Sequence, residues 1–299
     1  MEARSVVEQP DGRSNREGGG GDELRAHVHG MWAAVAGSWA EHAEYADARG
    51  APAAEKMLDL TRSQPGDRVL ELACGPGGLG LAAAERVAPG GEVVLSDVVA
   101  EMTSIASARA AALGLSNVST RELDLEDIDQ PDGSYDVVLC REGLMFAADP
   151  ARAAREIRRV LRPGGRFALA VWGPQARNPW LGVVFGAVSA QIGRPVPPPG
   201  IPGPFSLADS DKLAGLLSDA ELADVVVSEL PVPLRGASFE EWWARTSALA
   251  GPLAKMFAAL PEEAAQAIRA RVREATGPYE TPTGLEFPGV TLLAAGRRA

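Results

Sequence analysis

Short segments of β-prone residues recur along the middle of the chain, separated by longer segments that suit helices. The strand-like segments are residues 68–73, 92–96, 118–122, 135–140 and 166–172, and the helix-like ones are 78–87, 100–113 and 149–161. Residues 137–139 form a Val-Val-Leu run without polar alternation, which is typical of a central strand buried on both faces of a parallel sheet. The regular alternation of the two types of segment predicts an α/β fold.

The chain before this alternating part divides into a polar tail and a helical segment. Residues 1–22 are polar, with consecutive glycines at 18–21, and are expected to be a disordered tail. Residues 23–62 are expected to contain one helix over 23–48 and another over 51–60. Apolar side chains of the first helix recur every three or four positions, which predicts a stripe made of Trp32, Ala36, Trp39 and Ala43. This stripe either packs on the core or covers a ligand pocket as a lid.

The chain after residue 174 is expected to complete the sheet and to add two helical segments. Helices are predicted for 178–192, within 206–223 and for 238–276, and strands for 223–230 and 289–295. A stretch with six prolines among eleven residues, 194–204, is expected to be extended and stiff. These patterns divide the chain into a core over 63–174 and a part over 175–299 that completes the sheet. Within the second part, segments near 175–205 and 238–276 are expected to form a helical cap over a substrate.

A glycine-rich turn organises the predicted core. Residues 68–81, RVLELACGPGGLGL, run from a strand into the turn and then into a helix. Gly75 and Gly77 carry no Cβ, so the backbone can turn sharply and approach a ligand closely. The helix that follows directs its free N–H groups toward the same place. Strand, glycine turn and helix together predict a nucleotide-type ligand.

Asp97 supports this interpretation of the turn. It ends the next strand-like segment, about 20 residues beyond the turn, at the spacing at which a carboxylate meets the hydroxyls of a ribose. The alternative is an ordinary turn between strand and helix with an aspartate on the surface.

Composition and charge exclude several other functions. The 46% apolar content is ordinary for a globular protein of 299 residues. The net charge of −11 argues against binding to nucleic acid or to an anionic membrane, both of which need a basic patch. A run of 18 apolar residues is absent, so no membrane span is expected, and the polar N-terminus does not resemble a signal peptide.

The two cysteines indicate the cellular compartment that is expected for the protein. Cys74 and Cys140 both fall in the predicted core, where they are expected to be reduced, buried thiols of a cytoplasmic protein. The histidines and cysteines do not have the spacing of metal ligands, so no metal site is expected.

The segment Glu71-Leu72-Ala73-Cys74-Gly75-Pro76-Gly77 resembles motif I of the class I S-adenosylmethionine-dependent methyltransferases, an acid followed by Gly-x-Gly-x-Gly. The acid is Glu71 where aspartate is commoner, and Ala73 replaces the first glycine. Residues 161–173, LRPGGRFALAVWG, resemble small-molecule methyltransferases of the ubiquinone and menaquinone biosynthesis type. The resemblance covers 69–172 well and the remainder only by layout. It implies a Rossmann-like, seven-stranded, mostly parallel sheet in the order 3-2-1-4-5-7-6, with helices on both faces.

The resemblance also implies a cofactor, S-adenosylmethionine, with S-adenosylhomocysteine as the product. Asp97 is expected to bind the ribose. Asp124 follows the third strand, where the family has an aspartate that accepts from the adenine amino group, and Leu125 is expected to pack near the ring; Asp127 and Asp129 compete for this role, and an acidic surface loop is the alternative. The residues expected to bind the cofactor are Glu71, Ala73, Cys74, Gly75, Gly77, Asp97, Val98, Met102, Asp124, Leu125, Cys140 and Arg141.

A general base is not obvious in this sequence. The three histidines precede the glycine turn, and Met145 and Phe146 stand where several related O-methyltransferases have a histidine pair. If a base exists, His42, Glu142 or Tyr45 must supply it; otherwise alignment of the reactants and exclusion of water account for the reaction.

The expected substrate is a small, largely apolar or aromatic molecule, because the candidate pocket residues are apolar. These candidates are Trp32, Trp39, Met145, Phe146, Trp172, Trp180 and Trp243. We therefore expect methyl transfer to such a molecule, with oxygen favoured over carbon or nitrogen and a role in secondary metabolism. The alternatives are a non-methylating reaction or a scaffold on the same fold, and a nicotinamide-dependent oxidoreductase, which the glycine spacing disfavours. The oligomeric state does not follow from the sequence.

Overall fold

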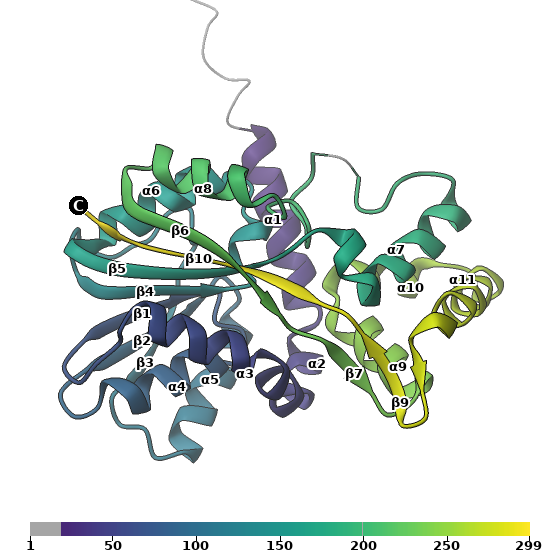
Figure 1. Ribbon diagram of the computed structural model, residues 1–299, viewed down its shortest axis with the longest axis horizontal. Helices are drawn as coiled ribbons and strands as arrows, with labels where there is room; N and C mark the ends of the chain where they lie inside the picture. Colours follow the sequence, from purple (N-terminus) through teal and green to yellow (C-terminus); the bar gives the residue numbers. More distant parts are fainter. Residues whose placement is uncertain (1–18, 199) are drawn as a thin grey trace, which may run out of the picture.

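The computed structural model describes residues 19–198 and 200–299, and its main sheet has seven strands. The bounds are β1 Arg68–Leu72, β2 Glu92–Asp97, β3 Val118–Glu122, β4 Tyr135–Arg141, β5 Leu161–Trp172, β6 Leu222–Pro231 and β10 Val290–Arg298. Their order is β3-β2-β1-β4-β5-β10-β6 (Figure 1). Strands β1 to β5 pair in parallel, whereas β10 is antiparallel to both of its neighbours. The predicted order, with β10 as the seventh strand, is confirmed.

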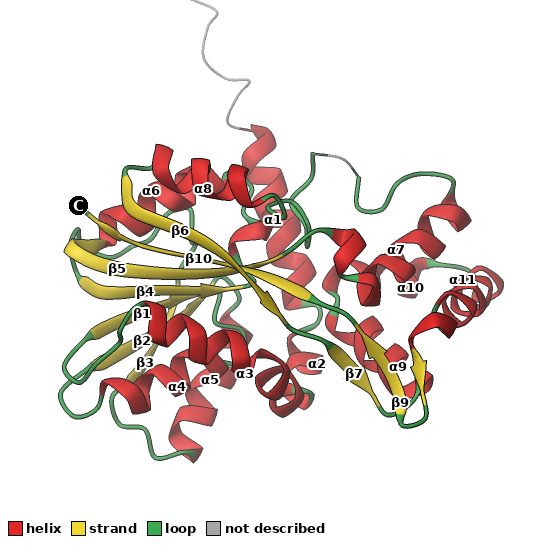
Figure 2. Ribbon diagram, viewed as in Figure 1, coloured by secondary structure: helices red, strands yellow, loops and turns green. Residues whose placement is uncertain are grey.

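Helices cover both faces of this sheet (Figure 2). One face carries α3 Ala43–Leu60, α4 Gly78–Val87 and α5 Ala100–Ala112, and the other carries α6 Pro150–Val160 and α8 Ser210–Asp219. Successive strand residues serve opposite faces, as the pleat requires. Val69 packs with the α3–α5 side, for example, whereas Leu70 packs with the α6 and α8 side. The sheet therefore separates two apolar layers, and this leaves its strand ends free for a site.

The N-terminal region differs from the prediction. Residues 19–22, expected in the tail, belong to helix α1 Gly19–Ala33, and residues 1–18 of that tail lie outside the described part. The single helix expected over 23–48 is wrong, because this stretch contains parts of three helices. A short helix, α2 Ala36–Glu41, follows α1, and His42 separates α2 from α3.

Helix α3 continues where a new helix was expected at residue 51. It runs through Gly50 and Pro52, both of which disfavour a helix interior. Buried Ala46, Ala53 and Met57 hold it against the core. Packing of these buried side chains thus outweighs the low helix propensity of Gly50 and Pro52.

A second sheet lies at the far end of the molecule and was not predicted. It consists of β7 Leu234–Gly236, β9 Gly284–Phe287 and β8 Glu280–Thr281, in that order. Strands of two to four residues are too short for an alternating pattern to show. Helices α9 Phe239–Leu249, α10 Gly251–Ala259 and α11 Glu262–Ala275 lie between β7 and β8 in the chain, and α11 packs on α7 Pro179–Ile192 (Figure 1).

Two short links join this sheet to the main one. Val232 and Pro233 connect β6 to β7, and Pro288 and Gly289 connect β9 to β10. The links touch each other, since the Val232 N–H donates to the Gly289 carbonyl at 2.9 Å. A Cβ on Gly289 would lie 2.1 Å from the Val232 carbonyl oxygen, so this crossing requires glycine.

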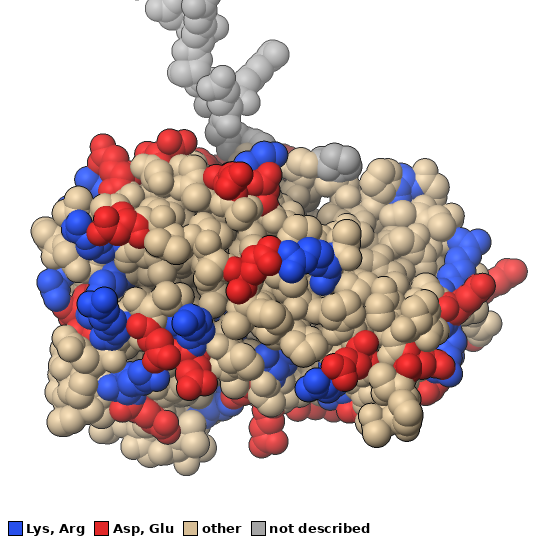
Figure 3. All heavy atoms as spheres, viewed as in Figure 1, with Lys and Arg blue, Asp and Glu red and all other residues tan. Residues whose placement is uncertain are grey.

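Charged side chains of both signs are intermingled over the face shown in Figure 3. Of the helices in residues 19–198 and 200–299, none combines the length and the apolar character that crossing a membrane would need.

Candidate functional site

A cavity opens at the carboxyl ends of β1, β2 and β4, where ligands bind in open parallel sheets. Residues after these strands form its polar half. Helices α1 and α3 contribute further wall residues, and α7, α9 and α10 line an apolar half. The cavity therefore joins the strand ends of the sheet to the helices beyond it.

The glycine turn is fastened to the end of β2. The Gly75 N–H donates to Oδ2 of Asp97 at 2.9 Å, and the Val99 N–H donates to Oδ1 at 3.0 Å. Burial raises the pKa of Asp97, and these backbone donors and His29 partly offset that rise. Gly75 has φ +53° and no atom within 4 Å of the position of a Cβ. Its backbone is thus open to a ligand in the cavity.

Ala73 takes the strained conformation that a glycine would take more readily. Its φ is +51°, in the left-handed region that disfavours side chains. Gly143, after β4, accommodates it, because a Cβ there would lie 2.4 Å from that of Ala73 and 2.9 Å from Sγ of Cys140. The absence of a side chain at Gly143 therefore makes room for Ala73 in place of the usual glycine.

Glu71 is buried, with 1% of its surface exposed, although it touches the cavity wall. Its Oε2 accepts a hydrogen bond from the Gly80 N–H at 2.8 Å, so it caps an amide of the first turn of α4. Burial raises the pKa of Glu71 to about 8, although the nearby Arg141 guanidinium works in the opposite direction. Glu71 therefore stabilises the start of α4, besides any contact with a ligand.

The loop after β3 carries Asp124 and Leu125 to the cavity. Oδ1 of Asp124 accepts from the Glu126 N–H at 2.8 Å. Glu126 is buried, and its Oε1 accepts from the Ala148 N–H at 2.6 Å, which ties the loop to the segment after β4. Arg25 of α1 lies 3.6 Å from the other oxygen of Glu126. The loop is therefore held from two sides of the cavity.

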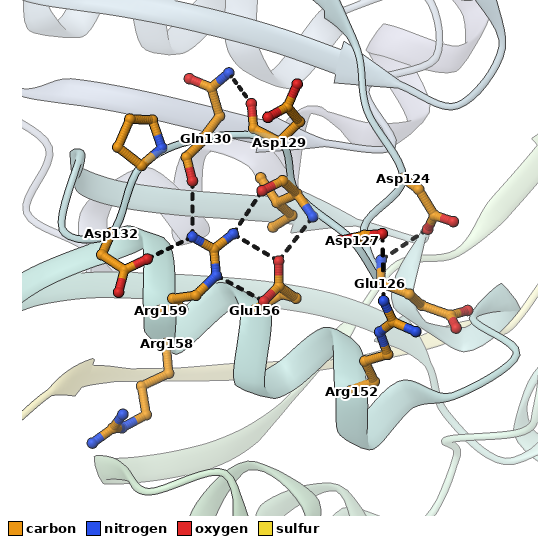
Figure 4. A network of polar contacts seen from close by, with 12 residues as sticks. Asp124, Glu126, Asp127, Asp129, Gln130, Asp132, Arg152, Glu156, Arg158 and Arg159 are labelled. Atoms are coloured by element: carbon orange, nitrogen blue, oxygen red, sulfur yellow. Dashed lines mark hydrogen bonds and ion pairs between the residues drawn. The ribbon is translucent and has the colours of Figure 1, made fainter.

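An ion-pair network on α6 fixes the far end of this loop (Figure 4). Arg159 donates to both carboxylate oxygens of Glu156 at 2.8 Å, to the Ile128 carbonyl at 2.6 Å and to the Gln130 carbonyl at 2.8 Å. A further bond, of 2.7 Å, reaches Asp132. The rigid fork of one guanidinium thus holds several points of the loop at once.

The apolar half of the cavity is built from aromatic pairs. Trp172 and Trp180 pack with their ring centroids 4.1 Å apart. Trp32 of α1 meets Phe146 edge-on at 4.9 Å, and Nε1 of Trp39 donates to the Leu249 carbonyl at 3.1 Å. The N-terminal helices thus contact both the sheet edge and the helices beyond it.

Charged and polar side chains meet in the wall of this apolar half. Arg49 of α3 donates to Oε2 of Glu142 at 2.7 Å and lies over the Trp172 ring, 5.2 Å from its centroid. Glu142 has φ +61°, a strained conformation for a residue with a side chain. Arg245 of α9 lies 4.0 Å from the ring centroid of Tyr45.

Most of the residues expected in the site do line the cavity. Those expected to bind the cofactor and found there are Glu71, Ala73, Cys74, Gly75, Asp97, Val98, Met102, Asp124, Leu125 and Arg141. Those expected to meet the substrate and found there are Trp32, Trp39, Met145, Phe146, Trp172 and Trp180, and Glu142 lines the cavity as well. Their individual roles stay predictions.

Four expected residues do not line the cavity, which corrects their placement. Gly77 turns the chain at the N-cap of α4 and faces α5, where a Cβ would lie 3.0 Å from that of Ala106. Cys140 packs in the core, and burial raises the pKa of its thiol to about 12. His42 stands at the joint of α2 and α3. Trp243 stacks on Phe239, 6.1 Å away, within the packing of α9.

Other wall residues were missed because the sequence gives no sign of them. Arg49 and Arg245 come from helices far apart in the chain, and only the fold brings them to one cavity. His29, one of the three histidines that precede the glycine turn, is exposed on α1 and lines the cavity, close enough to Asp97 to affect its pKa.

Residues 63–179 match the protein family described as a methyltransferase domain. This stretch is a methyltransferase domain. It contains β1 to β5 and the glycine turn, and the resemblance to class I S-adenosylmethionine-dependent methyltransferases is confirmed for it.

Relatives of known name share this methyltransferase domain. Nocamycin O-methyltransferase of Saccharothrix syringae is 44% identical over 119 residues, which are 40% of this chain and 42% of that protein. Demethylmenaquinone methyltransferase of Thermus thermophilus is 38% identical over 123 residues, 41% of this chain and 55% of that one. The chain thus spans about half the length of these relatives.

The fold is shared more widely than the sequence. The YcgJ protein of Bacillus superposes with a TM-score of 0.57 at 22% identity, covering 82% of this chain and 97% of that one. This likeness concerns the fold alone.

Proposed function

We propose that this protein transfers a methyl group from S-adenosylmethionine to a small, largely apolar or aromatic molecule. The observation that carries the proposal is a single cavity with two chemically different halves. Its polar half lies at the glycine turn, Asp97 and Asp124, and its apolar half is lined by the Trp172–Trp180 pair. A donor and an acceptor can therefore meet inside one site.

The residues of the polar half suit this cofactor. Carboxylates at the ends of β2 and β3 accept hydrogen bonds, which matches ribose hydroxyls at Asp97 and an adenine amino group at Asp124. The open backbone at Gly75 and the apolar side chains of Met102 and Leu125 suit the remaining surface of a nucleoside. S-adenosylmethionine supplies a methyl group that is already activated by the positive charge on sulfur.

The chain contributes alignment and exclusion of water more than acid–base chemistry. Glu142 lines the cavity, but its carboxylate is engaged by Arg49 at 2.7 Å, and His42 lies elsewhere. Tyr45, the third candidate base, also lines the cavity, with the Arg245 guanidinium over its ring. The aromatic wall and the N-terminal helices exclude water from the apolar half, which favours transfer between reactants held in line. An oxygen acceptor and a role in secondary metabolism belong to this proposal; the stretch shared with nocamycin O-methyltransferase supports them.

Calorimetric titration with S-adenosylhomocysteine, S-adenosylmethionine and NADP tests the cofactor. We expect binding of the two sulfur compounds and a loss of more than about tenfold in affinity in Asp97→Ala, because a charge-assisted hydrogen bond to a ligand disappears. Asp219→Ala, an exposed change at the end of α8, is the matched control. Unchanged affinity in Asp97→Ala would remove the ribose assignment, and binding of NADP alone would contradict the proposal.

A non-methylating reaction on the same fold is the second candidate. The engagement of Glu142 by Arg49 favours it, because this removes the free carboxylate that an oxygen acceptor with a high pKa would use. The two candidates differ in product, since methyl transfer releases one S-adenosylhomocysteine per turnover. Conversion of an acceptor without that release would establish the second.

A further inference from the structure

Two guanidinium groups stand in the wall of the otherwise apolar half of the cavity. Arg49 reaches it from α3 and Arg245 from α9, and only 17% and 16% of their side-chain surfaces are exposed. Tyr45 joins them: it lies under the Arg245 guanidinium and is four residues from Arg49 on the same helix, hence on the same face. We call Arg49, Tyr45 and Arg245 the basic cluster.

The donors of the basic cluster are incompletely used by the protein. Among the residues that the structure describes, the Arg49 guanidinium hydrogen-bonds to Glu142 alone. Arg245 pairs with Glu241 at 2.6 Å through Nη2, while its buried Nε has no acceptor in the described part of the chain. A buried donor without an acceptor is costly, by about 1–3 kcal/mol. This Nε is closed off from the cavity, whereas the remaining N–H groups of Arg49 are not, so a ligand can offer an acceptor to Arg49.

The two ion pairs of the basic cluster differ in their exposure. Glu142 offsets one positive charge inside the cavity, but Glu241 is 41% exposed, so water screens its side of the second pair. Each guanidinium thus has one carboxylate partner, and the partner of Arg245 does not line the cavity. The whole chain carries −11, so the two guanidinium groups in this wall are not a consequence of a generally basic surface.

We propose that the acceptor molecule is an apolar carboxylic acid whose carboxylate is held by Arg49 and Arg245 while its rings pack on Trp172 and Trp180. A guanidinium presents parallel N–H groups that match a carboxylate, and the aromatic pair supplies the apolar contact. This assignment of substrate class rests on the proposed function, in which the other half of the cavity holds the methyl donor.

Titration calorimetry with matched acids and amides tests the proposal. The probes are benzoate, 2-naphthoate and anthracene-2-carboxylate, each beside its neutral amide, with and without saturating S-adenosylhomocysteine. We expect at least one acid to bind about tenfold or more tightly than its amide. Arg245→Gln should reduce this ratio to below about threefold, whereas Arg245→Lys, which keeps the charge but loses the fork, should give an intermediate ratio. Arg235→Gln, on β7 and outside the cavity, is the matched control.

The outcomes separate this inference from the proposed function. If S-adenosylhomocysteine binds but no acid is preferred over its amide, or if Arg245→Gln keeps the full preference, the inference is overturned and the methyl-transfer proposal stands. If acids are preferred but neither sulfur cofactor binds, the proposed function fails instead. Melting temperatures of the variants show whether each one is folded.

Discussion

Replacing Gly50 by alanine should separate the stability of this protein from its affinity for the cofactor. Gly50 lies inside helix α3, where glycine is unfavourable, and its backbone faces Arg141 at the end of β4. A Cβ at this position would lie 1.6 Å from Nη1 of Arg141 and 2.5 Å from its Cζ. The guanidinium must therefore leave its place beside the cavity.

The two effects have opposite signs. Glycine in a helix interior costs about 1 kcal/mol relative to alanine, and the displaced group is the end of a flexible side chain. We therefore expect the melting temperature to stay the same or to rise by about 2–4 °C. If Arg141 binds the cofactor, as the sequence analysis expects, its displacement removes a charge-assisted interaction of about 1.5–3 kcal/mol, which corresponds to about 10–150-fold in the dissociation constant.

Differential scanning fluorimetry and calorimetric titration with S-adenosylhomocysteine measure the two quantities on one sample. Gly215→Ala in α8 is the matched control, because it makes the same change in a helix interior with no atom within 4 Å of the new Cβ. It should raise the melting temperature without changing affinity. Unaltered affinity in Gly50→Ala would refute the assignment of Arg141 to the cofactor. A melting temperature lower by several degrees would refute the claim that the Arg141 guanidinium can move aside.

Three further changes test other parts of the site. Glu71→Gln should gain stability relative to the wild type as pH rises from 5 to 9, measured as melting temperature. The Glu71 carboxyl has an ordinary pKa of 4.5 and a pKa of about 8 in the folded protein. The stability that the protonated carboxyl contributes to the wild type is therefore fully present below pH 4.5 and lost as pH rises through about 8. Arg159→Lys should lower stability by about 1–3 kcal/mol in urea titrations and weaken S-adenosylhomocysteine binding, because a single ammonium cannot replace the fork that holds the loop after β3. Gly143→Ala should destabilise more than Gly186→Ala, an open helical position, since its Cβ would collide with that of Ala73, and parallel thermal melts compare them.

Each of these expectations has a contradicting result. A pH-independent difference for Glu71→Gln would mean that this carboxyl is not buried as described. Normal cofactor binding in Arg159→Lys would separate the network on α6 from the site. Equal melting temperatures for Gly143→Ala and Gly186→Ala would show that the backbone near Ala73 adapts freely.

The core of the fold followed from local patterns. Segments such as Arg68–Leu72 and Gly78–Val87 have apolar runs, a glycine turn and a helical stripe that specify them with little help from the rest of the chain. The same local logic placed Asp97 and Asp124 at neighbouring strand ends, because parallel strands present their carboxyl ends at one edge. These parts of the site were accessible from the sequence.

The remaining parts depend on contacts between distant segments. Arg49 and Arg245 are brought together only by the packing of α3 and α9 around the cavity, which no spacing in the sequence encodes. Trp243 was misplaced because an aromatic residue that packs between helices has the same pattern as one that faces a ligand. The small sheet was missed because its strands are too short to show a period.

The two adjoining links at Val232–Pro233 and Pro288–Gly289 have a consequence for engineering. The chain enters and leaves the small sheet and helices α9–α11 at one point, between two paired strands of the main sheet. For protein design, the whole unit is a long insertion in the connection between two antiparallel strands, and it can be exchanged at a single pair of junctions. We expect it to be exchangeable between proteins of this architecture, since the ends that must be joined already lie within hydrogen-bonding distance of each other. Under the proposed function, we expect replacement of this unit to change the preference for the acceptor, while the glycine turn and the strand ends stay untouched.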